Sequence, residues 1–297
     1  APANARGYAV PAFNINNLEI CQAVMEAAIA EQAPIILQTS EGAIEYAGLE
    51  YLSAIAHVAA RANVPVVFHV DHGKKYDLVR ALITSHEYSS AMYDGSSLPL
   101  EENIARSAEL ARLAHKNGMS LEAEPGAIKG VEDNVSVAAR AAFFTEPKDA
   151  ERFVKETGCD ALAISIGTAH GAYKFDGVTK LDFARLTEIK KRVKIPLVLH
   201  GASNVPKKLV TLAEKYGARL GQACGVSDAA LLKAVALGIN KVNIDSDLRL
   251  AFVAGIHQAL ELNPKNIDPR KILLPAKKLM TELARHKMRL CGASRKA

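Results

Sequence analysis

The chain has 297 residues, of which 49% are hydrophobic and 23% are charged, and its formal net charge is +5. This composition supports a large buried core, and the scattered basic residues lack the interleaved aromatic residues of a nucleic-acid-binding surface. No apolar run reaches the roughly 18–20 residues of a membrane span, and no signal peptide opens the chain, so we expect no membrane association.

The four cysteines, Cys21, Cys159, Cys224 and Cys291, lie far apart and form no CxxC pair. This spacing argues against a disulfide framework and against a cysteine zinc site. It favours reduced thiols, which are typical of a cytoplasmic protein. We therefore expect the cysteines to be small buried side chains.

Short apolar segments alternate with segments of helical spacing along the whole chain. The predicted strands are 8–15, 34–39, 64–68, 90–93, 119–123, 161–167, 197–201 and 241–246. The predicted helices are 18–32, 49–62, 76–85, 100–117, 147–157, 183–193, 207–216, 228–237, 248–262 and 275–290. Residues 127–145 show no core period and are interpreted as a long mobile loop that covers an active site.

Eight buried strands alternating with helices predict a closed (β/α)8 barrel with additional C-terminal helices, built as a single domain over residues 1–297. The alternative is an open doubly wound sheet, but no GxGxxG follows the first strand. A polar side chain follows or ends each strand in turn: Asn14, Ser40, Asp71, Asp94, Glu124, His170, His200 and Asp245. In a barrel these eight ends converge on one face, which predicts a single site there.

Three of these strand ends carry a histidine followed directly by glycine: His72, His170 and His200. Three imidazoles with an open fourth position are typical of a catalytic zinc site, and each glycine leaves room for metal and substrate. A lone buried histidine is more often a hydrogen-bonded core residue, but convergence of the strand ends reverses that preference. His69 lies on the same strand face as Asp71 and is interpreted as a partner of a metal ligand.

The carboxylates near such a metal need separate roles. Asp71 adjoins His72 but is expected to point to the other side, where it can act as acid and base without binding metal. Glu124 and Asp94 are candidates for a second metal position or for orienting a ligand histidine. Glu132 lies in the predicted loop, where it is either a solvated charge or a functional group.

Phosphate binding in barrels commonly uses the loops after strands seven and eight. Here those loops are Gly201-Ala-Ser203 and Asn243-Ile-Asp245-Ser246, and Gly171 and Lys174 lie close to His170 in sequence. Together with the histidines they predict a phosphorylated substrate with a carbonyl group that a metal ion can polarise.

Nine motifs in order carry a family resemblance over the chain from about Tyr8 to its end. They are Pro11-Ala-Phe-Asn14, His69-Val-Asp-His-Gly73, Asp94-Gly-Ser96, Glu122-Ala-Glu124, Gly130-Val-Glu-Asp133, Gly167-Thr-Ala-His-Gly-Ala-Tyr-Lys174, His200-Gly-Ala-Ser203, Asn243-Ile-Asp245 and Asn263-Pro…Asp268-Pro-Arg270. With them the chain resembles the class II, metal-dependent fructose-1,6-bisphosphate aldolases, including the similar tagatose-bisphosphate aldolases.

The resemblance implies a role for each motif residue. Zinc, or cobalt or another divalent ion, is held by His72, His170 and His200, with Glu124 and Asp94 at an alternative position. Asp71 moves the proton at the C4 hydroxyl, and Glu132 handles the proton of the enediolate carbon. The implied substrate and phosphate contacts are Asn14, Ser40, Gly171, Lys174, Gly201, Ser203, Asn243, Asp245, Ser246 and Arg249, with a sodium or potassium ion nearby.

The resemblance also implies a homodimer or homotetramer in which Arg249 reaches the active site of a neighbouring subunit. Three positions depart from the family pattern: Ser97 stands in place of His, Pro125 in place of Leu, and Lys129 in place of Gly. We expect these three departures to stiffen or reshape the loop that positions Glu132. Extra residues at Leu220–Ser227 indicate a longer-loop subgroup.

The implied reaction is the reversible cleavage of fructose 1,6-bisphosphate to dihydroxyacetone phosphate and glyceraldehyde 3-phosphate, an aldehyde-lyase step of glycolysis and gluconeogenesis. Cleavage of tagatose 1,6-bisphosphate is the alternative, because the sequence leaves the stereochemistry at C4 open. A metal-dependent sugar-phosphate epimerase and a non-catalytic phosphate-binding protein are further alternatives. A Schiff-base aldolase needs a lysine at the site, whereas Lys241 is expected on the opposite, stabilising face of the barrel.

Overall fold

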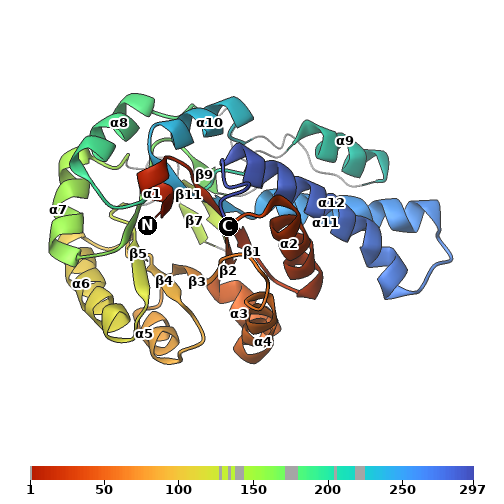
Figure 1. Ribbon diagram of the computed structural model, residues 1–297, viewed down its shortest axis with the longest axis horizontal. Coiled ribbons are helices and arrows are strands. Elements are labelled where there is room, and N and C mark those ends of the chain that lie inside the picture. Colours follow the sequence, from red (N-terminus) through yellow and green to blue (C-terminus); the bar gives the residue numbers. More distant parts are fainter. Residues whose placement is uncertain are drawn as a thin grey trace.

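The computed structural model describes residues 2–126, 129–132, 135–137, 144–170, 180–203, 206–217 and 225–297. Eight parallel strands close into a barrel in the order β1-β11-β10-β8-β5-β4-β3-β2, with helices around it (Figure 1). The barrel strands are β1 (Val10–Asn14), β2 (Ile35–Thr39), β3 (Val66–Gly73), β4 (Ser90–Tyr93), β5 (Ser120–Ala123), β8 (Ala161–Ala163), β10 (Leu197–Leu199) and β11 (Ile239–Ile244). The predicted (β/α)8 barrel with extra C-terminal helices is confirmed.

Most helices lie close to their predicted positions. They are α2 (Leu18–Glu31), α4 (Leu49–Ala59), α5 (Tyr76–Thr84), α6 (Leu100–Lys116), α7 (Pro147–Thr157), α8 (Phe183–Arg192), α9 (Lys207–Lys215), α10 (Asp228–Ala236), α11 (Ser246–Leu262) and α12 (Pro269–Leu290). Two short helices, α1 (Pro2–Arg6) and α3 (Glu41–Ala47), were not predicted. Both are about one or two turns long, which gives too few residues for a hydrophobic period to register.

The last helix begins earlier than its sequence pattern suggested. We predicted a start at Pro275, whereas α12 begins at Pro269 and contains Pro275 in its interior. Asp268 caps the helix by accepting a hydrogen bond from the backbone N–H of Arg270. An aspartate followed by proline is a helix-start signal, and it governs here because Pro269 occupies the first turn, where no N–H is needed.

The predicted loop over residues 127–145 contains regular structure. Strands β6 (Lys129–Glu132) and β7 (Val135–Val137) pair antiparallel, and β6 also pairs parallel with β9 (Ala169–His170). For residues 129–132 and 135–137 the interpretation as a loop was therefore wrong. Strands of two to four residues are set by pairing with distant backbone, which no local hydrophobic period reveals.

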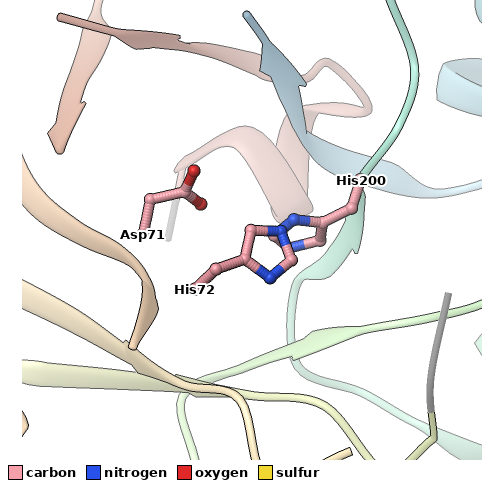
Figure 2. Close-up of side chains that lie close together, drawn as sticks. All are labelled: Asp71, His72 and His200. Carbon is pink, nitrogen blue, oxygen red and sulfur yellow. The ribbon is translucent and has the colours of Figure 1, made fainter. Parts of the chain in front are cut away.

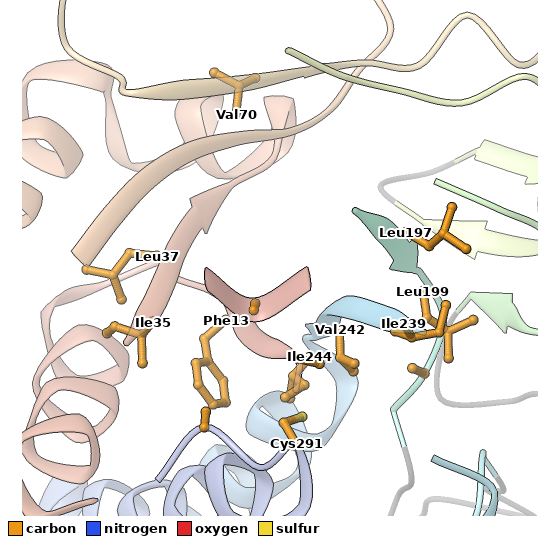
Figure 3. Packing of buried hydrophobic residues seen from close by; sticks show 14 of the residues in the cluster. Phe13, Ile35, Leu37, Val70, Leu197, Leu199, Ile239, Val242, Ile244 and Cys291 are labelled. Carbon is orange, nitrogen blue, oxygen red and sulfur yellow. The ribbon is translucent and has the colours of Figure 1, made fainter. Parts of the chain in front are cut away.

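The main hydrophobic core lies between the barrel and its helices. Alternate residues of the strands point outward into this layer, among them Phe13, Leu37, Leu199 and Val242 (Figure 3). In the same view Phe13 lies close to Cys291, which follows α12. The C-terminal helices therefore complete the layer around β1 and β11.

The barrel interior differs from this outer layer because it is mostly polar. Lys241 of β11 contacts Glu122 of β5, although these strands are not neighbours in the barrel. A direct contact between them must cross the interior. An apolar cluster of Met92, Ala163 and Val198 accompanies the polar side chains. Since strand residues alternate between two faces, the same strands supply an apolar outer layer and a polar lumen.

The C-terminal helices form an arm that extends beyond the barrel on one side, together with α9 (Figure 1). Helix α12 packs against α11 and α2. Lys287 of α12 and Asp247 of α11, both fully buried, form an ion pair of 2.8 Å. Within the described ranges, no helix combines the length and apolarity required to cross a bilayer.

Candidate active site

Two neighbouring side chains at the end of β3, Asp71 and His72, reach the same site. In an unbroken strand they would face opposite sides, which is what we predicted for Asp71. The pairing of β3 with β4 shifts register between Val70 and Gly73, and His72 has a φ of 47°. This irregularity turns the His72 side chain toward the same region as Asp71, so the predicted divergence of the two residues was wrong.

His72 meets His200, which follows β10 on the far side of the barrel mouth. Their ring centroids are 4.3 Å apart and the rings are nearly perpendicular. One ligand atom each from Asp71, His72 and His200 lies within 4.8 Å of the others, and all three residues are buried. Figure 2 shows the Asp71 carboxylate and the His72 ring, both from the end of β3, on one side and the His200 ring on the other. Such a donor set suits a divalent transition metal ion such as zinc.

Asp94, at the end of β4, orients His72. Its Oδ2 lies 3.0 Å from Nδ1 of His72, and its Oδ1 accepts a hydrogen bond from the Ser96 hydroxyl. Although burial raises the pKa of the Asp94 carboxyl, the hydrogen bond and charge of His72 and the bond from Ser96 outweigh burial and hold it well below its usual value. An ionised Asp94 accepts the Nδ1 proton and thereby leaves Nε2 of His72 as the ligand atom.

Glu124 completes a second candidate donor set. A ligand atom of Glu124 lies within 4.8 Å of ligand atoms of both His72 and Asp94, and all three side chains are buried. The backbone carbonyl of Glu124 accepts a hydrogen bond of 2.8 Å from Asn103, a buried residue of α6. The two predicted roles of Asp94, orienting a histidine and sharing a second metal position, are both compatible with this geometry.

Asp71 is held by amides from two neighbouring strand ends. Asn14 and Asn243 each donate a hydrogen bond of 2.8 Å to its carboxylate, one to each oxygen. The side-chain amide of Gln38 in turn donates a hydrogen bond of 2.7 Å to the side-chain oxygen Oδ1 of Asn14. The carboxylate is therefore fixed in direction beside the two imidazoles, as a group that transfers a proton at a defined substrate atom must be.

Both ring nitrogens of His200 have hydrogen-bond partners. Nε2 lies 2.8 Å from Glu122 Oε1, and Nδ1 lies 2.9 Å from the amide nitrogen of Asn243. The other Glu122 oxygen accepts a hydrogen bond of 2.7 Å from Lys241. Burial raises the pKa of Glu122, but Lys241 and His200 outweigh it and hold that pKa well below its usual value. Burial, together with the charge of His72, lowers the pKa of His200 below its usual value.

His69 faces the lumen below this site. Its Nε2 lies 3.2 Å from Lys241 and its Nδ1 lies 2.9 Å from the Ser90 hydroxyl. Burial, together with the charge of Lys241, lowers the pKa of His69 well below its usual value. His69 therefore contacts Lys241 and Glu122, and the predicted role as partner of a metal ligand would operate through these residues.

Sequence reasoning misplaced Lys241 and gave no separate role to Glu122. Lys241 is buried in the barrel lumen, whereas we predicted it on the opposite face of the barrel. The signal was available, because Lys241 lies two residues before Asn243 and Glu122 two residues before Glu124. Residues two apart in a strand share a face, so each points into the same interior as its functional neighbour.

The predicted phosphate-binding loops lie at the same end of the barrel. The Ser203 hydroxyl accepts a hydrogen bond of 3.5 Å from the backbone N–H of Asp245. Arg249 of α11 forms an ion pair of 2.7 Å with Asp245, the residue directly before Ser246, where this helix begins. Gly201 has a φ of 61°. The Ser40 hydroxyl caps α3 by accepting a hydrogen bond from the backbone N–H of Ala43, which is a structural role.

Several predicted residues lie outside what the structure describes. Gly171, Lys174, Cys224 and most of the Leu220–Ser227 segment fall in the undescribed ranges. For His170, Glu132 and Lys129 the structure gives the strand backbone without the side chain, and Gly130 is aligned with His170 between β6 and β9. The predicted third histidine ligand and the predicted loop carboxylate therefore remain predictions.

Comparisons with known proteins agree on one family. The family model described as "Fructose-bisphosphate aldolase class-II" matches residues 1–296. A fructose-bisphosphate aldolase of Thermus caldophilus is 43% identical over 98% of this chain and 95% of its own, and one of Helicobacter pylori is 40% identical over 99% and 96%. The crystal structure of the YdjI aldolase from Escherichia coli K12 matches with a TM-score of 0.79 and 29% identity, covering 100% of this chain and 96% of that one.

Proposed function

Since this chain belongs to the class II fructose-bisphosphate aldolase family, a family of metal-dependent lyases, we propose how its own residues carry out the reaction. The chain cleaves fructose 1,6-bisphosphate reversibly to dihydroxyacetone phosphate and glyceraldehyde 3-phosphate, a step of glycolysis. The observation that supports the proposed site is the buried cluster of Asp71, His72 and His200 at the barrel mouth.

The metal ion is held by His72, His170 and His200, and it is zinc, with cobalt or another divalent ion able to replace it. When bound, such an ion supplies Lewis-acid stabilisation of the negative charge that develops on the substrate carbonyl oxygen. The described donors fit this role, because Asp94 fixes the ring of His72 and Glu122 fixes the ring of His200. Glu124 and Asp94 provide the alternative metal position near His72.

Asp71 removes the proton from the C4 hydroxyl of the hexose during cleavage and returns it during condensation. Asn14 and Asn243 hold its carboxylate in one orientation, so the carboxylate accepts the hydroxyl proton from a defined direction. Glu132 handles the proton at the carbon that becomes nucleophilic in the three-carbon product. The support for Glu132 is its place in the Gly130–Asp133 motif, together with the pairing of its strand with the strand that carries His170.

The phosphate groups bind to the loops after β8, β10 and β11. Gly171, Lys174, Gly201, Ser203 and Ser246 contact one phosphate, and Asn14, Ser40, Asn243 and Asp245 contact the sugar. Arg249 contacts a phosphate in the site of a neighbouring subunit, which makes the active assembly a homodimer or homotetramer. Within the chain Arg249 contacts Asp245 through Nε and Nη2, and a guanidinium group has five N–H donors, so it can contact a phosphate as well.

The chain is further proposed to be a single cytoplasmic domain. The hydrophobic core cluster runs from Ala3 to Ala293, which supports one domain over residues 1–297. Cys21, Cys159 and Cys291 are buried thiols without a disulfide, and burial raises the pKa of each to about 12. Unreactive reduced thiols are typical of the cytoplasm.

Removing the metal tests the proposed mechanism. Dialysis against EDTA is expected to abolish triose formation, and zinc or cobalt added back is expected to restore it. The His200→Ala variant is expected to lose both activity and bound metal, as measured by elemental analysis. Full activity after complete metal removal would overturn the proposal.

A coupled triose assay with two hexose bisphosphates tests the substrate. We expect fructose 1,6-bisphosphate to be cleaved faster than tagatose 1,6-bisphosphate, in line with the names of the relatives. Borohydride with substrate is expected to trap no adduct, because Lys241 is buried and donates hydrogen bonds to Glu122 and His69. A trapped adduct at Lys241 would favour Schiff-base chemistry instead.

A further inference from the structure

We infer that Glu122, held in place by Lys241 across the barrel lumen, is a positioning residue that fixes the tautomer and orientation of His200. The inference rests on the proposed function only in that His200 is taken as a metal ligand. Glu122 does not belong to either candidate donor set in the described residues, and it contacts the site through His200 alone among the proposed ligands.

Glu122 and Lys241 form an ion pair inside the barrel lumen. Both side chains are buried, with exposed side-chain fractions of 2% and 8%. The interior of a barrel of this type is usually filled by branched apolar residues. A buried ion pair seldom stabilises a fold more than apolar residues of similar size would. Stability alone is therefore a weak explanation for a carboxylate and an ammonium group in the lumen.

The hydrogen-bond partners of His200 determine which of its ring nitrogens carries the proton. A carboxylate has no hydrogen to donate, so the contact between Glu122 and Nε2 requires a proton on Nε2. The Asn243 amide nitrogen has two hydrogens, and it contacts Asp71 at 2.8 Å and Nδ1 of His200 at 2.9 Å. Both contacts require an acceptor, so Nδ1 carries the lone pair. Nδ1 is thus the nitrogen of His200 that can bind a metal ion, which would take the place of the hydrogen bond from Asn243.

Lys241 is itself held in place by side chains of other strands. Its ammonium group donates to Glu122 at 2.7 Å and lies 3.2 Å from Nε2 of His69, whose other nitrogen contacts Ser90. These residues come from β11, β5, β3 and β4, on different sides of the barrel. The carboxylate of Glu122 is therefore fixed from several strands, and it transmits this fixed position to the ring of His200.

The first experiment uses the wild-type chain without metal. Protein labelled with ¹⁵N at histidine is examined by NMR, and the His200 signals are assigned by comparison with His200→Asn. We expect the Nε2–H tautomer at His200, with Nδ1 unprotonated. A proton on Nδ1 would overturn the inference, and this test needs no substitution in the Glu122–Lys241 ion pair.

The second experiment removes the ion pair without leaving a buried charge, in the double variant Glu122→Gln/Lys241→Met. Cobalt affinity is measured by competition with a chelator, and the visible spectrum of the cobalt-loaded protein reports ligand geometry. Loss of a partner of a metal-binding histidine typically weakens metal affinity about 10–100-fold, and we expect a loss in that range with an altered spectrum. Wild-type affinity and spectrum in a folded double variant would contradict the inference.

The matched control is the second buried ion pair, between Asp247 and Lys287, which lies outside the barrel lumen. The variant Asp247→Asn/Lys287→Met is expected to change thermal stability while leaving cobalt affinity and spectrum unchanged. Equal losses of affinity in both double variants would mean that any buried ion pair acts through general stability, and would overturn the inference.

Failure of the proposed function has a separate signature. If His200→Asn bound cobalt as tightly as the wild type, His200 would not be a ligand and the proposed metal site would be wrong. If His200→Asn lost cobalt while the Glu122→Gln/Lys241→Met variant retained it, the metal site would stand and only the role of Glu122 would fall.

Discussion

At the end of β3, two adjacent side chains reach one site because the backbone departs from strand geometry at His72. A φ of 47° is unfavourable for a residue with a Cβ atom and costs of order 1–3 kcal/mol. The register shift against β4 accommodates this conformation. At the scale of single residues, a local cost in stability thus brings an imidazole and a carboxylate together.

The role of Asp71 is tested by Asp71→Asn, which preserves shape and removes the proton acceptor. General acid–base groups contribute about 10²–10⁴-fold to rate, and we expect kcat to fall by about that factor. Bound metal is expected to stay at the wild-type level, because the histidines remain. Steady-state kinetics and elemental analysis measure the two quantities.

Asp149→Asn, at an exposed position in α7, is the matched control and is expected to keep wild-type kinetics. Loss of metal together with activity in Asp71→Asn would instead identify Asp71 as a ligand, in keeping with its place in the buried donor set.

At the scale of elements, α11 and α12 approach so closely that one position admits no side chain. A Cβ atom on Gly255 of α11 would lie 2.3 Å from both the backbone nitrogen and the Cα atom of Ala276 in α12. Backbone atoms of a packed helix cannot move aside as a flexible side chain can. Gly255 therefore fixes the distance between the two helices of the C-terminal arm.

The variant Gly255→Ala tests this close approach. Alanine normally favours a helix over glycine by about 1 kcal/mol, so an isolated helix would gain stability. Here we expect the opposite sign, a loss of about 1–3 kcal/mol in the free energy of unfolding, because the added methyl group overfills the contact. Urea unfolding measures the change.

Glu261→Ala, at an exposed position near the end of α11, serves as the control and is expected to be close to neutral. A Gly255→Ala protein as stable as the wild type would show that α11 and α12 can separate freely.

At the scale of the whole molecule, the C-terminal helix is tied to the start of the barrel by one carboxylate. Glu31, at the end of α2, accepts hydrogen bonds from Arg285 and Arg289 of α12 and from Ser294. The hydrogen bond from Arg289 is the largest influence, and with the other donors it outweighs burial and lowers the pKa of Glu31 to about 2. This carboxylate joins residues more than 250 positions apart.

The depressed pKa predicts a pH dependence of stability. Because the folded-state pKa lies below the usual value of 4.5, Glu31 stabilises the fold above about pH 4.5 and loses this effect as the pH falls toward 2. Both arginines are partly exposed, so we expect Glu31→Gln to cost about 1 kcal/mol at neutral pH. The difference from wild type is expected to shrink as the pH falls below 4.5.

Denaturant unfolding of both proteins over this pH range measures the effect. Glu282→Gln, at an exposed position in α12, is the control and should show no such trend. A constant difference between Glu31→Gln and wild type at every pH would show that packing, and not charge, links the two helices.

The sequence by itself determined the barrel and the residues at its mouth. Each strand was visible as an apolar run, and each polar strand end was visible beside it, because these signals are local. Parallel strands place all their carboxyl ends on one face, so the sequence predicted that the strand ends carrying His72 and His200 meet there. The helix start at Asp268-Pro269 was also readable, although Pro275 drew the prediction away from it.

Only the tertiary structure decided which way the side chains turn and what they meet. The shared direction of Asp71 and His72 depends on a register shift between β3 and β4, and the pairing of Lys241 with Glu122 depends on two strands facing each other across the lumen. The short strands β6, β7 and β9 likewise depend on one another. Such features arise from contacts between segments distant in the chain. The two-residue spacing of Lys241 from Asn243 and of Glu122 from Glu124 indicates which face each side chain takes, but no local pattern shows which partner it meets.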